Sequence, residues 1–236
     1  MKILALDTSG KQAGAAIMDE YITIGEICIN AQSGPKAFHH SQILMPGVER
    51  LFALCGMELA DIDYVAYVSG PGSFTGLRIG AATALGLARG ANKLAVGVPT
   101  LDALAYNMLC VNEGMLIVPL MDARRGQVYG AIYRKEGGEI KRLTDYFACS
   151  IEDALAQVPT TAVFLGDGTC ANKTVIEVNC PTPQFAPLNA NRQRPASVAL
   201  CALHQLKTTP PPNPGTEPVE IIYIRDPQAV REQKKS

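Results

Sequence analysis

Short runs of apolar residues, some of them alternating with polar ones, cover the first thirty residues of the chain. They span residues 2–7, 13–18 and 21–29, and the turn-forming pairs Ser9-Gly10 and Asp19-Glu20 separate them. Strands of this length joined by such short turns predict an antiparallel meander of three strands.

The spacing of apolar residues becomes helical after residue 40. Ser41 is the expected N-cap of this helix and Gly56 its expected stop, while Pro46 predicts a kink or an irregular first turn. The apolar positions at helical spacing are Leu44, Val48, Leu51 and Cys55. The next expected elements are a buried strand over 63–69, a glycine-rich turn, a helix over 77–89 and a strand over 94–98.

The rest of the chain repeats this mixture of strands and helices. The strands over 128–133 and 140–148 are expected to pair through a turn at Gly137-Gly138. The other expected elements are helices over 101–110, 151–157 and 196–206 and strands over 115–121 and 162–165. Two halves of similar plan predict an α/β fold with a duplicated βββαβα unit.

A proline-rich stretch separates the last predicted helix from the C-terminal residues. Residues 209–218 predict an extended linker. We expect one domain to combine residues 1–103 with 209–236, and a second, more divergent domain to cover residues 104–208. The role of the basic end of the chain is left open, and exposure to solvent is the more frequent state of such a tail.

Composition narrows the class of protein. Hydrophobic residues make up 47% and charged residues 18%, which excludes a disordered chain. The formal net charge of -1 gives no basic field that could hold a nucleic acid by itself. Seven cysteines without a C-x-x-C pair argue against a disulfide framework or a zinc site. No apolar stretch approaches the length of a membrane span, so we expect a cytoplasmic protein.

The segment from Gly70 to Gly76, GPGSFTG, lies between a predicted strand and a predicted helix. This arrangement can aim backbone N–H groups and a helix N-terminus at an anion. It is not a Walker A loop, because Leu77-Arg78 replaces the Lys-Ser/Thr pair that contacts phosphate and magnesium. Close packing of the following helix is the other interpretation, and it is the more frequent one for such a loop.

Small residues form a stripe along the helix that follows. Gly76, Gly80, Ala84 and Ala88 are four residues apart and therefore share one face. Such a face lets another backbone approach closely, either within the core or in a partner helix. The spacing alone favours the core.

Three further turns place polar groups at strand ends. The segment from Asp7 to Gly10 can hold a hydrated metal and phosphates, but side-chain capping of the turn is the more common role. Gly166-Asp167-Gly168 has the same two interpretations. Arg124 and Arg125 can form an internal ion pair with Asp122, the more frequent case, or contact phosphate. The sequence contains no H-E-x-x-H cluster and no G-x-S-x-G elbow, so it predicts no catalytic centre.

The order of these segments resembles that of the TsaB (YeaZ) family, which belongs to the glycoprotease-like (M22 peptidase-like) superfamily. The resemblance rests on Asp7-Thr8-Ser9, His40-Ser41-Gln42, the block from Gly70 to Gly80, Val98-Pro99-Thr100-Leu101, Asp122-Ala123-Arg124 and Tyr223-Ile224-Arg225. The block GPGSFTGLRIG is its most specific part. Gly10 and Gly14 stand where the family usually has Thr and Ser, and Gln127 stands where it has Glu, which weakens a nucleotide role for the first turn.

The resemblance implies an actin/Hsp70-like (ribonuclease H-like) fold and a place in the bacterial machinery that makes threonylcarbamoyladenosine in tRNAs reading ANN codons. There the family member does not transfer the group. It scaffolds and activates the transferase TsaD together with the ATPase TsaE, and it forms a homodimer when TsaD is absent. The resemblance implies no required cofactor, with ATP or ADP as a candidate at the complex interface, and an indirect or weak contact with tRNA. A peptidase is a third hypothesis that the residues do not support, because the sequence offers no nucleophile with a base and no set of zinc ligands.

The resemblance also implies that pairing occurs through the two helices of the first half, which moves the small-residue stripe from the core to an interface. The implied interface residues are Leu44, Val48, Leu51, Cys55, Gly76, Leu77, Gly80, Ala84, Leu87 and Ala88. The candidate nucleotide or phosphate contacts are Asp7, Thr8, Ser9, Gly70, Gly72, Ser73, Thr75 and Arg78. The alternative hypothesis is an actin-like ATP-binding enzyme, an ATPase or kinase, that uses the second set.

Overall fold

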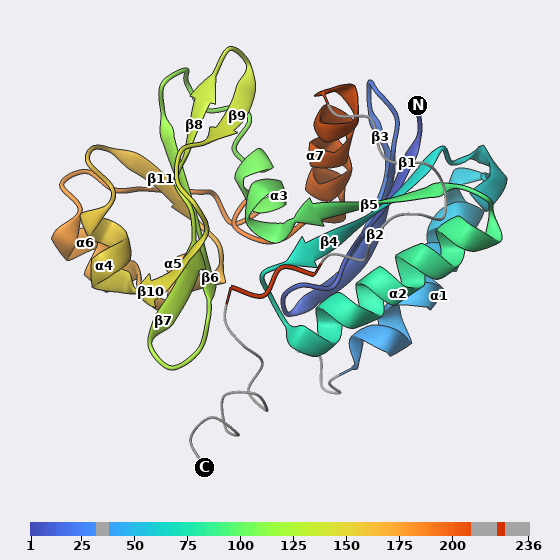
Figure 1. Ribbon diagram of the computed structural model, residues 1–236, viewed down its shortest axis with the longest axis horizontal. Coiled ribbons are helices and arrows are strands. Elements are labelled where there is room, and N and C mark those ends of the chain that lie inside the picture. The colour runs from blue at the N-terminus through green and yellow to red at the C-terminus, as the bar shows by residue number, and fades with distance from the viewer. Residues whose placement is uncertain (32–37, 209–220, 225–236) are drawn as a thin grey trace. The chain divides into compact units, whose positions relative to one another are not determined.

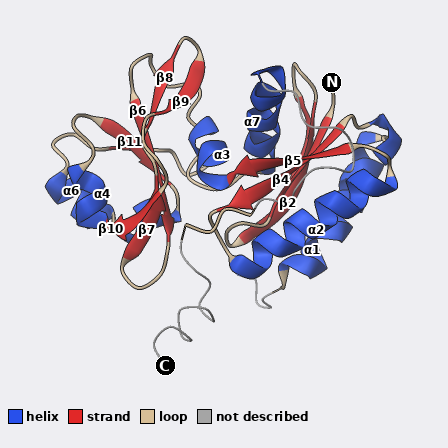
Figure 2. Ribbon diagram, viewed as in Figure 1, coloured by secondary structure: helices blue, strands red, loops and turns tan. Residues whose placement is uncertain are grey.

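The computed structural model describes residues 1–31, 38–208 and 221–224 (Figure 1). These residues form two compact units. One contains residues 1–31, 38–103, 193–208 and Ile221, and the other contains residues 104–192 and 222–224. Each unit combines a β-sheet with helices (Figure 2). Within the described residues, no helix is both long and apolar enough to cross a membrane.

The first unit contains a five-stranded sheet in the order β3-β2-β1-β4-β5. Its strands are β1 (Ile3–Asp7), β2 (Gln12–Met18), β3 (Thr23–Asn30), β4 (Tyr64–Gly70) and β5 (Leu94–Pro99). The first three strands are antiparallel, which confirms the predicted meander, and β4 and β5 run parallel to β1. The carboxyl ends of β1, β4 and β5 therefore lie at one edge of the sheet.

Helices cover both faces of this sheet. Helices α1 (His40–Cys55) and α2 (Phe74–Gly90) lie on one face and α7 (Pro195–Thr208) on the other (Figure 1). Every residue of β1 is buried, because its alternate side chains meet helices on opposite sides. Leu4 and Leu6 belong to the core under α1 and α2. A short 3-10 helix, Leu59–Asp61, leads into β4.

The placement of α7 corrects one expectation from the sequence. We expected this helix in a second domain of residues 104–208, but it packs on β1 and β2 of the first unit. Glu26 on β3 fixes its start, because the Glu26 carboxylate accepts a hydrogen bond from the Ala196 N–H at 3.0 Å and pairs with Arg194. The predicted linker over 209–218 lies outside the described residues.

The ends of α1 differ slightly from the prediction. The N-cap is His39 rather than Ser41, and the Gln42 side chain accepts a hydrogen bond from the His39 N–H at 2.9 Å. The helix continues through Pro46 and ends at Gly56. Gly56 has a φ of 62°, the left-handed conformation that favours glycine, which confirms the predicted stop.

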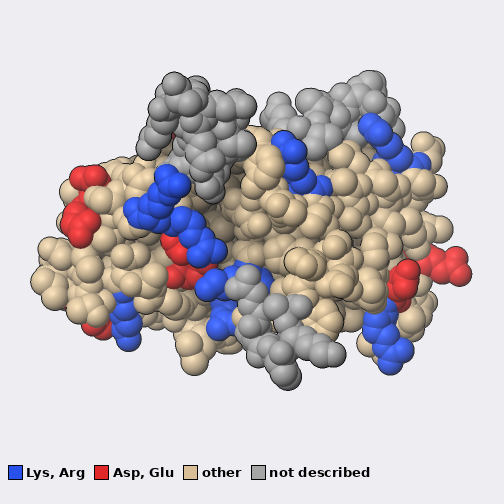
Figure 3. All heavy atoms as spheres, turned by 90° about the horizontal axis from the view of Figure 1, so that it is seen from below, with Lys and Arg blue, Asp and Glu red and all other residues tan. Residues whose placement is uncertain are grey.

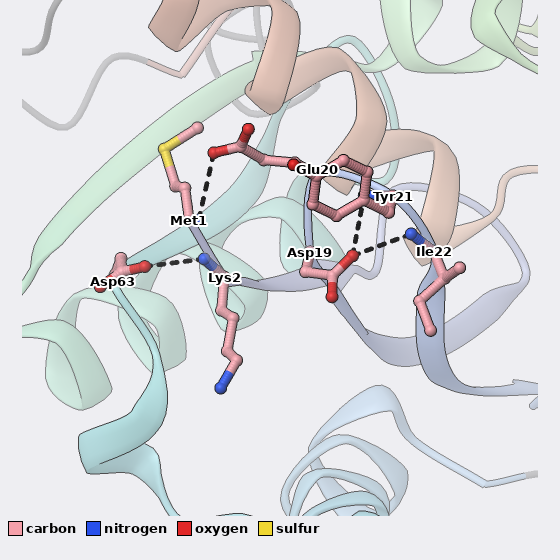
Figure 4. A network of polar contacts seen from close by, with 7 residues as sticks. All are labelled: Met1, Lys2, Asp19, Glu20, Tyr21, Ile22 and Asp63. Carbon is pink, nitrogen blue, oxygen red and sulfur yellow. Dashed lines mark hydrogen bonds and ion pairs between the residues drawn. The ribbon is translucent and has the colours of Figure 1, made fainter.

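The turn between β2 and β3 closes around Asp19 (Figure 4). The Asp19 carboxylate accepts hydrogen bonds from the N–H groups of Tyr21 and Ile22, both at 2.8 Å. These two hydrogen bonds lower the pKa of the Asp19 carboxyl. The other contacts in Figure 4 join the Met1 ammonium to Glu20 at 3.2 Å and the Lys2 N–H to Asp63 at 2.7 Å.

The second unit repeats the strand order of the first. Its main path is β10-β7-β6-β11-β12, with β8 paired to β6 and β9 to β8. The strands are β6 (Leu116–Asp122), β7 (Gln127–Gly130), β8 (Tyr133–Glu136), β9 (Glu139–Arg142), β10 (Phe147–Ser150), β11 (Ala162–Leu165) and β12 (Gln184–Phe185). Its helices are α4 (Ile151–Ala156), α5 (Asp167–Ala171) and α6 (Lys173–Asn179), and α3 (Thr100–Tyr106) begins in the first unit and ends in the second. The matching orders support the predicted duplication.

The second unit contains two separate strand pairs where the sequence predicted one. Instead of one pair over 128–133 and 140–148, β7 pairs with β10 and β8 pairs with β9. The Gly137-Gly138 turn therefore joins only β8 to β9. The break falls at Ala131 and Ile132, which are both buried although they are consecutive. Their burial interrupts the alternation on which a single strand would depend.

Candidate functional site

The first turn and the glycine-rich loop lie against each other at the carboxyl edge of the first sheet. The Ser73 N–H donates a hydrogen bond to the Ser9 carbonyl oxygen at 2.7 Å. The Thr8 hydroxyl donates to the Gly76 carbonyl oxygen at 2.8 Å. A Cβ on Gly72 would lie 2.5 Å from the Ser9 carbonyl oxygen. The two loops that were candidates for phosphate binding thus contact one another directly.

Part of the N-terminus of α2 is also occupied by the protein itself. The Ser73 hydroxyl accepts a hydrogen bond from the Gly76 N–H at 3.2 Å and caps the helix. Thr75 and Arg78 are exposed rather than turned towards the first turn. The Arg78 guanidinium stacks over the Phe74 ring at 4.1 Å. The predicted phosphate set is therefore divided between buried and exposed positions, with Gly70 at the end of β4 among the buried ones.

The small-residue stripe of α2 faces the core, which corrects the implied interface. Of the ten implied interface residues, eight are buried and two, Cys55 and Leu87, are half-buried against the first core. A Cβ on Gly76 would overlap the Thr8 carbonyl oxygen, and one on Gly80 would overlap the Thr8 hydroxyl. The glycines thus allow α2 to approach β1 closely. This agrees with what the spacing alone favours.

The outer face of the same two helices has a different set of residues. Ala82 and Gly86 of α2 are exposed and lie four residues apart, and a Cβ on Gly86 would meet nothing within 4 Å. On α1, Leu54 is 65% exposed, and Phe74 at the start of α2 is 39% exposed. The sequence reasoning missed this outer face, because both faces of α2 carry small residues.

Asp7 is the one carboxylate of the predicted phosphate set. Its side chain is buried, and one carboxylate oxygen accepts hydrogen bonds from the N–H and the hydroxyl of Ser9 at 2.9 and 2.7 Å. Within the described residues, the other oxygen has no hydrogen-bond partner. Burial raises the pKa of the Asp7 carboxyl, and the hydrogen bonds from Ser9 oppose this rise. Folding therefore favours the neutral acid.

Gln193, a buried polar residue from a distant part of the chain, lies beside Gly10 of the first turn. A Cβ on Gly10 would lie 3.0 to 3.2 Å from the Gln193 amide, and one on Gly14, which pairs with Asp7, would lie 3.0 Å from Pro195 Cγ. The absence of a side chain at Gly10 makes room for Gln193. At Gly14 it makes room for the Ile27 carbonyl oxygen of β3, which would lie 2.4 Å from a Cβ, and for the first residue of α7. No motif in the sequence indicated that Gln193 lies at the first turn, because its position depends on how α7 packs on the sheet.

Replacing Asp7 with asparagine is expected to stabilise the protein at neutral pH and to flatten its pH dependence. The folded pKa lies above the unfolded value of 3.8, so this group's stabilisation is complete below the unfolded pKa and is lost as the pH rises through the folded pKa. Asp19→Asn is the control, and its effect on the pH dependence of stability should have the opposite sign. The pKa of Asp19 is lowered in the folded protein, so the stability that its carboxylate contributes is lost as the pH falls. Denaturation midpoints from acidic to neutral pH measure both effects, and a steeper pH dependence in Asp7→Asn would contradict the assignment.

The end of β6 holds a second polar cluster. The Asp167 carboxylate accepts a hydrogen bond from the Asp122 N–H at 3.0 Å, and the Asp122 carboxylate accepts one from the Arg124 N–H at 2.8 Å. The Arg124 guanidinium lies 3.7 Å from Asp122, so the predicted ion pair is present but long. Across the described part of the chain, no group of three or more His, Cys, Asp or Glu side chains is arranged to hold a metal ion.

Comparison with known proteins places this chain in a family. The family model described as TsaD, tRNA N6-adenosine threonylcarbamoyltransferase, matches residues 35–202. The tRNA threonylcarbamoyladenosine biosynthesis protein TsaB of Bacillus subtilis is 32% identical over 85% of this chain and 86% of its own length. The chain belongs to the TsaB (YeaZ) family. The Escherichia coli TsaB protein is 36% identical, but that match covers 58% of this chain and only 56% of the relative.

Solved structures agree with the predicted fold. YeaZ from Pseudomonas aeruginosa superimposes with a TM-score of 0.70 at 23% identity, covering 88% of this chain and 92% of that one. An inorganic polyphosphate/ATP-glucomannokinase from Arthrobacter has a TM-score of 0.52 at 11% identity, covering 86% of this chain and 99% of that one. These likenesses confirm the actin-like fold of this TsaB-family chain.

Proposed function

We propose that this chain is a non-catalytic subunit of tRNA threonylcarbamoyladenosine biosynthesis in the cytoplasm. In this proposal it binds and activates a TsaD-type transferase, a TsaE-type ATPase joins the pair, and the partner carries out the chemistry. The names of the Bacillus subtilis and Escherichia coli relatives support the general role. The matching family model is described as that of the transferase, which supports a common origin of this chain and its proposed partner.

The contact between the first turn and the glycine-rich loop is the observation that carries the non-catalytic part of the proposal. An actin-like ATPase or kinase would need these loops open to hold nucleotide phosphates. Here Ser9 and Ser73 are joined by a hydrogen bond, as are Thr8 and Gly76. Because the Ser73 N–H and the Thr8 hydroxyl already donate to backbone carbonyl oxygens, they are not free to bind phosphate, which favours a binding role over the ATP-binding alternative.

The outer face of α1 and α2 is the proposed partner surface. It offers exposed small residues on α2, Ala82 and Gly86, and an exposed Leu54 on α1, which suits the close approach of a partner helix. We place the homodimer that forms without the transferase on the same face. The chain requires no cofactor of its own in this proposal, and ATP or ADP is assigned to the interface of the complex.

A drop-out reconstitution tests the proposed function. The purified transferase and ATPase are incubated with a TsaC-type enzyme, which supplies the activated threonylcarbamoyl-AMP, and with threonine, bicarbonate, ATP and unmodified tRNA. The reaction is run with and without this chain, and the modified nucleoside is measured by mass spectrometry. We expect product only when the chain is present. Equal product in its absence would reject the proposal. ATP hydrolysis by the chain alone, abolished in an Asp7→Asn variant, would favour the enzymatic alternative instead.

A further inference from the structure

The turn between β6 and β7 holds two arginines in an uncommon backbone conformation. Arg124 and Arg125 have φ angles of 65° and 57°, and Gly126 follows with 70°. Residues with large side chains rarely adopt the left-handed region, where glycine and asparagine are favoured. Two consecutive arginines therefore occupy positions that the backbone alone would assign to other residue types.

Backbone hydrogen bonds hold this turn without using the guanidinium groups. The Ala123 N–H donates to the Gln127 carbonyl oxygen at 2.9 Å, and the Gln127 N–H donates to the Arg124 carbonyl oxygen at 3.3 Å. The carboxylates of Asp122 and Asp167 each accept a backbone N–H. The nearby acids thus brace the turn through its backbone, and the only guanidinium contact that they make within the described residues is the exposed Arg124–Asp122 pair at 3.7 Å.

Both guanidinium groups are directed to solvent. The Arg124 side chain is 76% exposed, and its ion pair with Asp122, at 3.7 Å, is of the exposed kind that contributes little to stability. Arg125 is also exposed, and in the part of the chain that the structure describes its side chain has no acid or hydrogen-bond acceptor as a partner. On the face drawn in Figure 3, Lys and Arg side chains lie in separate groups with acidic ones among them. A polyanion on this face would be held at local sites.

We infer that the Arg124–Arg125 turn binds phosphate groups of an RNA backbone. Guanidinium groups match phosphate oxygens in a bidentate geometry, and two of them on one braced turn can engage neighbouring phosphates. A chain with a net charge of -1 needs such a local site to contact a nucleic acid. The inference rests on the proposed function, in which the RNA is the tRNA substrate and this turn is a secondary contact beside those of the partner.

The test measures binding of an unmodified tRNA transcript to the assembled proteins containing wild-type or Arg124→Gln/Arg125→Gln chain, across a series of salt concentrations. We expect the double variant to weaken tRNA binding by about tenfold at low salt, the loss of two charge-assisted contacts being the cause. The slope of log K against log salt should decrease in magnitude by about one to two. Arg124→Lys/Arg125→Lys should retain most of the slope, because it retains the charge.

Arg134→Gln/Lys141→Gln is the matched control, because it removes two positive charges from β8 and β9 of the same unit. This control should bind tRNA as the wild type does. An equal loss in both double variants, or an unchanged slope in the turn variant, would overturn the inference, and so would weaker binding of the transferase with unchanged tRNA affinity. The drop-out reconstitution uses the wild-type chain, so none of these outcomes changes its result. A failure of the inference about the turn can therefore be told apart from a failure of the proposed function.

Discussion

Gly76→Ala is expected to lower the free energy of unfolding by about 2 kcal/mol or more, which is a large effect for the addition of one methyl group. The added Cβ would overlap the Thr8 carbonyl oxygen, a backbone atom that cannot rotate away. Relief requires α2 to move from β1 and weakens the hydrogen bond from the Thr8 hydroxyl to the Gly76 carbonyl oxygen. Chemical denaturation followed by circular dichroism measures the change.

Gly86→Ala is the matched control for this prediction. It makes the same substitution in the same helix, but its Cβ meets nothing within 4 Å. Because alanine is a better helix former than glycine, this variant should gain about 0.5 to 1 kcal/mol. If Gly76→Ala were as stable as Gly86→Ala, the close packing of α2 on β1 would be wrong, and the stripe would be free for a partner after all.

Gly86→Arg is expected to weaken binding of the transferase by about thirtyfold or more while leaving the monomer folded. A long charged side chain at this exposed position would prevent a partner helix from approaching α2. The expected loss of binding free energy is of the size seen at interface hot spots. The corresponding change at Gly80 would not test the interface, because it would disrupt the core beside Thr8. Titration calorimetry with the purified transferase measures the affinity.

The same position supplies the control for the interface. Gly86→Ala should bind the transferase as the wild type does, because its methyl group hardly widens the helix. Light scattering of Gly86→Arg without the transferase should also show less homodimer, since we place both contacts on one face. Unchanged transferase affinity in Gly86→Arg, with a folded monomer, would remove the partner surface from the outer face of α2.

Local signals in the sequence were sufficient for most of the first unit. The three-stranded meander follows from apolar runs and short turns, and the end of α1 follows from a glycine at a left-handed position. The strand β11 (Ala162–Leu165) has the predicted bounds. Helices α5 and α6 and strand β12 were not predicted, because elements this short carry too few periodic positions to be recognised.

The sequence by itself determined most of the longer elements, the duplicated α/β plan and, through the block GPGSFTGLRIG, the family. Tertiary structure decided what those elements do. Spacing shows that Gly76 and Gly80 share a face, but only the contact with Thr8, which is 68 residues from Gly76, shows that this face is internal. The docking of α7 depends likewise on Glu26 and Arg194, which are 168 residues apart. Sequence patterns indicate interactions between residues that are close along the chain. The burial and the charge state of a side chain depend on which distant segments pack against it.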